Sequence, residues 1–381
     1  MEKNVIDYFI SLVQIDSESR DEAEIAQKIR VDLENLGAEV QTDEAYHKTR
    51  GNAGNIYAFF PGNIKKKPIL FCAHLDTVIP GKSIKPVIGE DRITSDGSTI
   101  LGGDDKSGIA EIIWAIKEIK TNRIEHAPLE ILFTVSEEIG LLGAKYFNYT
   151  KLKSEFGYAF DGHRVGELTI AAPSQNSIEL IIPGKEAHAG VEPEKGINAI
   201  KLAAEAITKM PSGRIDPETT CNIGIISGGK ATNIVPNKVM IKAEARSHDE
   251  VKLTSISDKI VEVAKSVIKS TGSQDLVDKF KSIQINEYKS FKFSKKTDVV
   301  ELGLKAARNI GLEPNTSIGG GGSDANIINQ NNLRVVIAGS GMSNVHTVDE
   351  YILKSELEKG TRWIKEMIML YSNSENNLGS G

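Results

Sequence analysis

The sequence predicts an α/β protein in which a layered α/β domain is interrupted by a second, smaller unit. Over about the first 170 residues, short apolar runs typical of buried strands alternate with helical patterns, which is characteristic of a layered α/β domain. After Pro173 the expected order of elements becomes βαββαβ, the ferredoxin-like arrangement. From about residue 292 the chain returns to helices and a buried strand.

In the first segment, apolar residues recur at helical spacing, and Gly37 provides a stop for the second helix. We expect helices over 4–14, 22–36 and 107–120, and strands near 38–42, 56–60, 69–73, 129–135 and 156–160. In the middle segment we expect strands near 175–183, 221–227, 238–246 and 281–288, and helices near 196–209 and 249–271. In the last segment we expect a helix over 299–310, then the glycine run Gly319–Gly322, a strand at 333–338 and a helix over 355–371.

These patterns predict a discontinuous domain over 1–173 and 292–371, with 174–291 inserted. The polar run 372–381 is expected to be a disordered tail. The length of 381 residues also favours two domains over one.

Composition narrows the class of protein. A net charge of -6 gives no basic footprint for nucleic acid, so small charged or polar solutes are the expected partners. Cys72 and Cys221 lie in apolar contexts and are expected to be reduced core thiols. We find no apolar run long enough to cross a membrane and no signal-peptide core, so we expect a cytoplasmic protein.

Ionisable residues stand at the ends of several expected strands. His74, Glu137-Glu138 and Asp161 each end or follow an apolar run, and open α/β sheets build their sites at such carboxyl ends. Asp104 precedes a helix among glycines, and His346 lies in a late loop. Together they form a mixed nitrogen and oxygen environment that suits divalent metal ions. The inserted position of the middle unit follows, because His346 must join ligands from the first segment.

The adjacent residues Glu137 and Glu138 could have two different roles, one as a metal ligand and the other as a base. Adjacent residues at a strand end point to different sides, so one can bind metal while the other remains a free base. Asp76, two residues after His74, can orient the imidazole through its second nitrogen. Taken singly, each motif also has a structural interpretation: a solvated acidic turn for Glu137-Glu138, an N-cap for Asp104, and a core or surface histidine for His346.

Four motifs together resemble one known family. Ala73–Val78, Gly102–Gly108, Thr134–Gly140 and Asn344–Glu350 are similar to the metallopeptidase family of peptidase T, carboxypeptidase G, aminoacylase and succinyl-diaminopimelate desuccinylase. The resemblance covers nearly the whole chain and is greatest to the peptidase T branch, the tripeptide aminopeptidases. It implies a di-metal catalytic domain that binds two divalent ions per subunit, zinc by default with cobalt or manganese as alternatives.

The resemblance also implies roles for single residues. His74 and Asp161 match ligands of the first metal, Glu138 and His346 match ligands of the second, and Asp104 matches the bridging aspartate. Glu137 matches the general base, and Asp76 the residue that orients the histidine.

In the family the inserted unit is a lid that also forms a homodimer. His188 matches a histidine that reaches the partner's active site and binds the oxyanion, although its sequence context alone indicates an ordinary loop residue. Asn233, Arg246 and Gly321 match substrate contacts.

Three functions follow from these observations. The first is an aminopeptidase acting on tripeptides, the second a carboxypeptidase or N-acyl amino-acid deacylase, and the third a non-catalytic metal- or peptide-binding protein. No expected ligand or base is missing, which disfavours the third. No motif decides which end of the substrate is read.

Overall fold

The computed structural model describes residues 2–374, which divide into two compact units. Unit 1 contains the chain up to Ala171, then Lys292–Gly319 and the chain from Ser323 onward. Unit 2 contains Ala172–Phe291 and the short segment Gly320–Gly322. The sequence placed the boundaries at 174 and 291 but left the glycine segment in the first domain.

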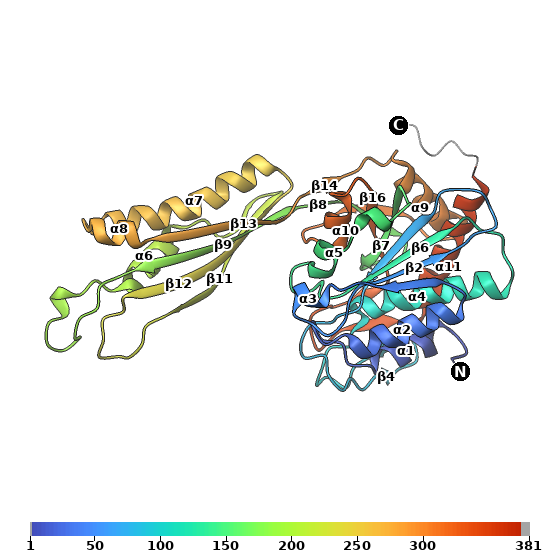
Figure 1. Ribbon diagram of the computed structural model, residues 1–381, viewed down its shortest axis with the longest axis horizontal. Coiled ribbons are helices and arrows are strands. Elements are labelled where there is room, and N and C mark those ends of the chain that lie inside the picture. The colour runs from blue at the N-terminus through green and yellow to red at the C-terminus, as the bar shows by residue number, and fades with distance from the viewer. Residues whose placement is uncertain (1, 375–381) are drawn as a thin grey trace. The chain divides into compact units, whose positions relative to one another are not determined.

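A mixed sheet runs through unit 1 (Figure 1). Its strand order is β1 (Glu39–Thr42), β2 (Ile56–Phe60), β6 (Leu129–Thr134), β3 (Ile69–His74), β7 (Phe156–Gly162), β16 (Arg334–Gly339), β8 (Glu167–Ala172) and β14 (Phe291–Lys292), with β15 (Asn315–Ile318) paired to β8. Strands β6, β3, β7 and β16 are parallel to their neighbours in this group. Their carboxyl ends therefore lie at one edge.

The central strands are buried on both faces, which explains why they read as continuous apolar runs. In β3, all six residues are buried. Ile69, Phe71 and Ala73 belong to the main hydrophobic core, whereas the alternate residues Leu70 and Cys72 lie outside that cluster because successive side chains point to opposite faces. Cys72 and Cys221 are both free and buried, as predicted.

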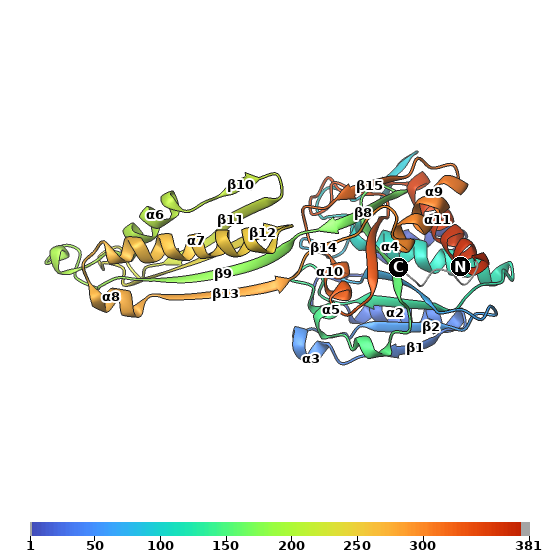
Figure 2. The ribbon, with the colours of Figure 1, turned by 90° about the horizontal axis from the view of Figure 1, so that it is seen from above.

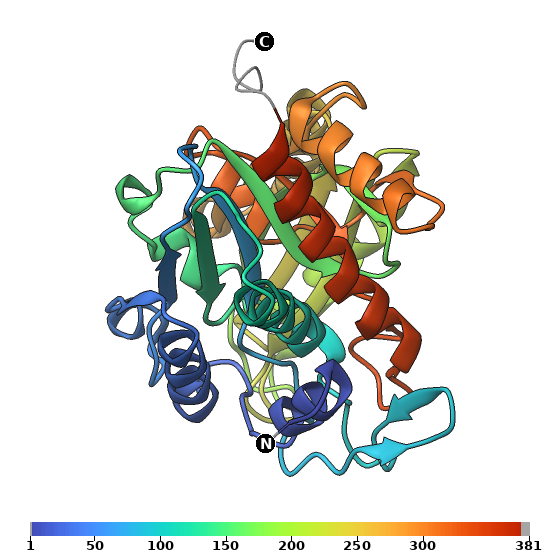
Figure 3. The same ribbon diagram turned by 90° about the vertical axis from the view of Figure 1, so that its right-hand side faces the viewer.

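The helices of unit 1 fall into two groups. The main core is covered by α1 (Val5–Val13), α2 (Ala23–Asn35), α4 (Gly103–Thr121), α9 (Asp298–Asn309) and α11 (Lys354–Asn373). Figure 3 shows α11 in red crossing unit 1, and α11 contacts both α4 and α9. The second group consists of three short helices that contribute no residue to that core: α3 (Tyr46–Thr49), α5 (Leu142–Tyr146) and α10 (Asp324–Asn329). Of these, α10 contacts β7 and β16.

The end of α11 corrects the sequence-based boundary. The helix continues through Asn373 because Met367, Ile368 and Tyr371 keep burying an apolar face, so 372 and 373 are helical and not part of a disordered tail. The remainder of the expected tail from 375 lies outside the described residues.

Unit 2 has the predicted ferredoxin-like order, with one strand added after its first helix and one short helix added after its second. Its sheet runs β10 (Gly213–Asp216), β11 (Thr219–Gly228), β12 (Lys238–Ser247), β9 (Ser174–Pro183) and β13 (Lys281–Tyr288). Helices α6 (Ala199–Lys209) and α7 (Glu250–Lys269) pack on this sheet, as Figure 2 shows from above. The edge strand β10 and the short helix α8 (Gln274–Lys279) were not predicted.

A small second sheet in unit 1 was also missed. It contains β17 (Met342–Ser343), β18 (Tyr351–Leu353), β5 (Arg92–Thr94) and β4 (Val87–Ile88). Its strands have two or three residues each, too few to show an alternating pattern. Among the helices described here, none is long and apolar enough to span a membrane.

Candidate metal centre

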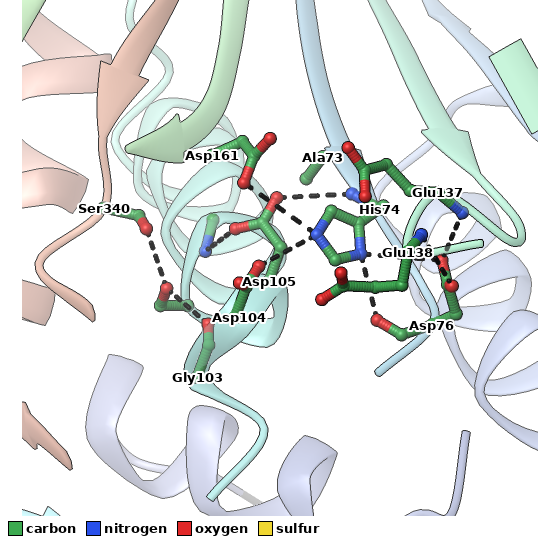
Figure 4. A network of polar contacts seen from close by, with 12 residues as sticks. Ala73, His74, Asp76, Gly103, Asp104, Asp105, Glu137, Glu138, Asp161 and Ser340 are labelled. Atoms are coloured by element: carbon green, nitrogen blue, oxygen red, sulfur yellow. Dashed lines mark hydrogen bonds and ion pairs between the residues drawn. The ribbon is translucent and has the colours of Figure 1, made fainter. Parts of the chain in front are cut away.

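The carboxyl ends of three neighbouring strands bring the predicted residues together. His74 is the last residue of β3, Asp161 lies near the end of β7, and the turn holding Glu137 and Glu138 follows β6. Because β3 pairs in parallel with both β6 and β7, these side chains meet at one edge of the sheet (Figure 4). Sequence reasoning had placed them there.

Asp104 lies between the two histidines. Its Oδ1 is 2.9 Å from Nε2 of His74, and its Oδ2 is 3.2 Å from Nε2 of His346. Its backbone is not helical, although it lies within the bounds of α4, so the regular helix begins after Asp105. One carboxylate with an oxygen facing each imidazole has the arrangement of a bridging ligand.

Each histidine has a second carboxylate near it. Nε2 of His346 lies 2.9 Å from Glu138 Oε1, and Nε2 of His74 lies 3.9 Å from Asp161 Oδ1. His74 is almost fully buried, whereas the side chain of His346 is 51% exposed. The two halves of the centre therefore differ in their access to solvent.

The adjacent glutamates point to different sides of His74, as Figure 4 shows. Within residues 2–374, one set of three possible metal ligands has its ligand atoms within 4.8 Å of one another: His74, Asp104 and Glu138. Glu137 is buried beside this group but is not part of it.

Asp76 does more than was predicted. The closest partner of His74 Nδ1 is the backbone oxygen of Asp76 at 2.9 Å, and the Asp76 carboxylate lies farther away at 3.5 Å. That carboxylate instead accepts hydrogen bonds from the backbone amides of Glu137, at 2.8 Å, and Glu138, at 3.2 Å. Asp76 thus supports both the histidine and the glutamate turn.

Buried negative charge is in excess here. Burial raises the pKa of Glu137, Glu138 and Asp161, and nearby carboxylates add to the effect in each case. Asp104 is the exception, because contacts with His346 and His74 outweigh its burial and lower its pKa. A site with several mutually repelling carboxylates, two imidazoles and clustered donor atoms fits divalent cations, which would neutralise the charge.

Glu350 is a supporting residue that sequence reasoning missed. It is fully buried and accepts hydrogen bonds from the backbone amides of Leu101 and Gly102, both at 2.8 Å, and of Asp104 at 3.0 Å. It holds the loop that carries the bridging carboxylate. The available signal was its place four residues after His346 in the same motif.

The four remaining predicted residues belong to unit 2 and form two pairs. His188 and Asn233 are both exposed. The backbone amide of Ala189, next to His188, donates a hydrogen bond to the backbone carbonyl oxygen of Asn233 at 2.9 Å. The side chain of Arg246 donates hydrogen bonds to the Glu244 carboxylate. Gly321 lies near Arg246, since a Cβ added to Gly321 would lie 3.6 Å from Nη1 of Arg246.

The chain is similar to known peptidases over nearly its whole length. Residues 172–271 match the family model of the peptidase dimerisation domain of the M20 peptidases, and residues 89–176 match that of the M42 glutamyl aminopeptidases. The crystal structure of the aminopeptidase PepT from Bacillus cereus is 41% identical, covers 97% of this chain and 98% of its own, and has a TM-score of 0.86. The chain belongs to the M20 family of metallopeptidases.

Two further proteins extend this likeness. A tripeptidase from Staphylococcus aureus is 36% identical, with 98% of this chain and 99% of its own covered and a TM-score of 0.91. The YqjE protein of Bacillus subtilis, described only as uncharacterized, is 41% identical over 96% of this chain and 98% of its own length. The M20 chain described here is thus a metal-dependent peptidase, and the predicted family is confirmed.

Proposed function

We propose that this M20 peptidase is an aminopeptidase that removes the first residue of tripeptides. The observation that carries the chemistry is Asp104, whose two carboxylate oxygens each face a different histidine while Glu137 stands outside the donor group. The tripeptide preference is supported by the full-length similarity to an aminopeptidase and a tripeptidase, both above 35% identity.

Five residues would hold two divalent ions. We assign His74 and Asp161 to one ion, Glu138 and His346 to the other, and Asp104 to both. Zinc suits these nitrogen and oxygen donors, and cobalt or manganese would also be accepted. When bound, such ions polarise the scissile carbonyl and lower the pKa of the attacking water.

Glu137 moves the proton in this scheme. Its carboxylate takes a proton from the attacking water and delivers it to the nitrogen of the leaving amine. Glu137 is buried beside the donor group without belonging to it, which leaves its carboxylate available for this role. Asp76 keeps the backbone of Glu137 in place and orients His74.

Unit 2 would complete the site and the assembly. We propose that it acts as a lid and forms a homodimer, as the matched dimerisation model suggests, with His188 reaching the partner's active site to bind the oxyanion. Asn233, Arg246 and Gly321 would then contact the peptide. We also retain the expectation of a cytoplasmic location.

One assay tests the substrate assignment. Free, N-acetylated and C-amidated forms of one tripeptide are compared as substrates of the metal-loaded protein. An aminopeptidase must pair the substrate's α-ammonium with a carboxylate, so N-acetylation should abolish cleavage while amidation weakens it less. Rapid hydrolysis of the acetylated peptide, with the free peptide intact, would make the protein a deacylase and leave the metal assignments in place.

A further inference from the structure

The position of Glu137 depends on a backbone conformation that its neighbour adopts reluctantly. Ser136, the residue directly before it, has a φ of 54°, in the left-handed region. For a residue other than glycine this conformation is disfavoured, because Cβ comes too close to the following carbonyl oxygen. Contacts around Ser136 must therefore hold it there.

A buried carboxylate from a distant part of the chain makes those contacts. Glu22, directly before α2, is fully buried, and its Oε1 accepts hydrogen bonds from the backbone amide of Ser136 at 3.0 Å and from its hydroxyl at 2.9 Å. The same oxygen accepts the amide of Arg20 at 2.8 Å. Its second oxygen, Oε2, is buried and has no hydrogen-bond partner among the residues described.

Asp76 continues this hold along the turn. Its carboxylate takes the amides of Glu137 and Glu138, so two buried carboxylates bind three successive backbone amides (Figure 4 shows the two at Asp76). Asp76 also accepts the hydroxyl of Ser19, at 2.6 Å, from the loop that leads to Glu22. This loop therefore supports the glutamate turn twice, directly through Glu22 and indirectly through the contact of Ser19 with Asp76.

We propose that Glu22 is a positioning residue that keeps Ser136 in its left-handed conformation and thereby aims the carboxylate of Glu137 at the substrate. The inference rests on the proposed function in taking Glu137 as the general base. The carboxylate of Glu22 accepts hydrogen bonds from Ser136 and Arg20, and Glu22 is not among the proposed metal ligands. What it contributes is an acceptor oxygen, and its negative charge is not required.

The first test compares two substitutions at Glu22 in the metal-loaded enzyme. Glu22→Ala removes the acceptor, and we expect kcat for a free tripeptide to fall about 10–100-fold, since misplacing a reacting group by about 1 Å has effects of this size. KM and the bound metal should stay near wild-type values. Glu22→Gln keeps an acceptor oxygen and should retain kcat within about threefold. Glu24→Ala, at an exposed position in the first turn of α2, is the matched control.

A double-mutant cycle shows whether Glu22 acts through Ser136. Glycine adopts the left-handed conformation at no steric cost, so Ser136→Gly should make the hold of Glu22 largely unnecessary. We expect Glu22→Ala to lower kcat by less than about threefold in the Ser136→Gly background, a clear departure from additivity. A merely structural role would produce additive losses.

Either of two results would overturn the proposal: an equal loss of kcat from Glu22→Ala in both backgrounds, or a loss from Glu22→Gln as large as that from Glu22→Ala. If Glu22→Ala fails to fold, Glu22→Gln is judged against the wild type: a kcat within about threefold supports the proposal, and a loss of more than about tenfold overturns it. Failure of the proposed function is recognised separately with Glu137→Ala, because an active Glu137→Ala enzyme would remove Glu137 as the base whatever the coupling between Glu22 and Ser136.

Discussion

The carboxylate of Glu350 accepts the backbone amide of Asp104 at 3.0 Å, so a residue of the late histidine loop supports the ligand placed between the two imidazoles. It also accepts the amides of Leu101 and Gly102 with its other oxygen. Both oxygens are thus used by backbone donors. The loop of His346 and the start of α4 are fixed together by this one side chain.

Glu350→Gln tests this support. The amide group would face backbone N–H donors with an N–H₂ of its own, so one side of the contact would become repulsive. We expect metal binding to weaken about 10–100-fold, the usual effect of removing a residue that orients ligands. Titration calorimetry with zinc measures it, and an affinity equal to the wild type would show that Glu350 has no part in holding the site.

Asp104→Ala and His346→Ala should differ in how much metal they lose. Asp104 faces both histidines, so its removal should lower the occupancy of both ions, whereas removal of His346 should empty one. Elemental analysis after dialysis gives the metal content per chain. A single strong site in the unmodified protein would contradict the two-metal assignment.

Mixing subunits tests the proposed role of His188. Glu137→Ala and His188→Ala proteins are combined under conditions that exchange subunits. In a mixed dimer one site would have its own Glu137 and the partner's His188, so activity should return to about a quarter of the wild-type value at equal mixing of a symmetric dimer. No recovery, with exchange shown by differently tagged chains, would place His188 in the active site of its own chain.

Glu111 predicts a stability that depends on pH. Its side chain is fully buried in α4, and neither carboxyl oxygen has a hydrogen-bond partner within the described residues. Burial, with the charges of Asp105 and Glu356, raises the pKa of this carboxyl well above its usual range. The folded state therefore keeps a proton that the unfolded state releases, and stability falls as pH rises above the unfolded value.

Glu111→Gln removes this penalty. Its melting temperature should match the wild type near pH 4.5 and exceed it increasingly toward pH 8, with each kcal/mol worth about 2–4 °C. Thermal unfolding at both pH values measures the difference, and Glu24→Ala is an exposed control. A constant gap across this range would mean that Glu111 does not change its protonation on unfolding.

The sequence predicted the strands that are buried on both faces because their apolar runs are long and uninterrupted. The same property placed His74 and Asp161 at the sheet edge. By contrast, the two- and three-residue strands of the small sheet have no readable pattern, and β10 is an edge strand with mostly exposed residues. The end of α11 was missed because Ser372 and Asn373 are polar, although Tyr371 before them is buried.

Within the site, local motifs gave the ligands but not their supports. Glu22 contacts Ser136 across a sequence separation of 114 residues, and Glu350 contacts Asp104 across 246, distances at which spacing carries no information. The Asp76 carboxylate was expected on the imidazole, yet two backbone amides compete for it and draw it to the glutamate turn. Only folded geometry decides such competition.

The discontinuity of unit 1 sets an order for its assembly on the ribosome. A nascent chain that has reached Phe291 already contains His74, Asp104, Glu138 and Asp161, and all of unit 2 except Gly320–Gly322 has been made. It lacks β16, which lies between β7 and β8 in the sheet, and it lacks His346 and Glu350. The inserted unit can begin to fold before the first domain has this strand, so the metal centre is completed late in synthesis and interrupted chains cannot form it.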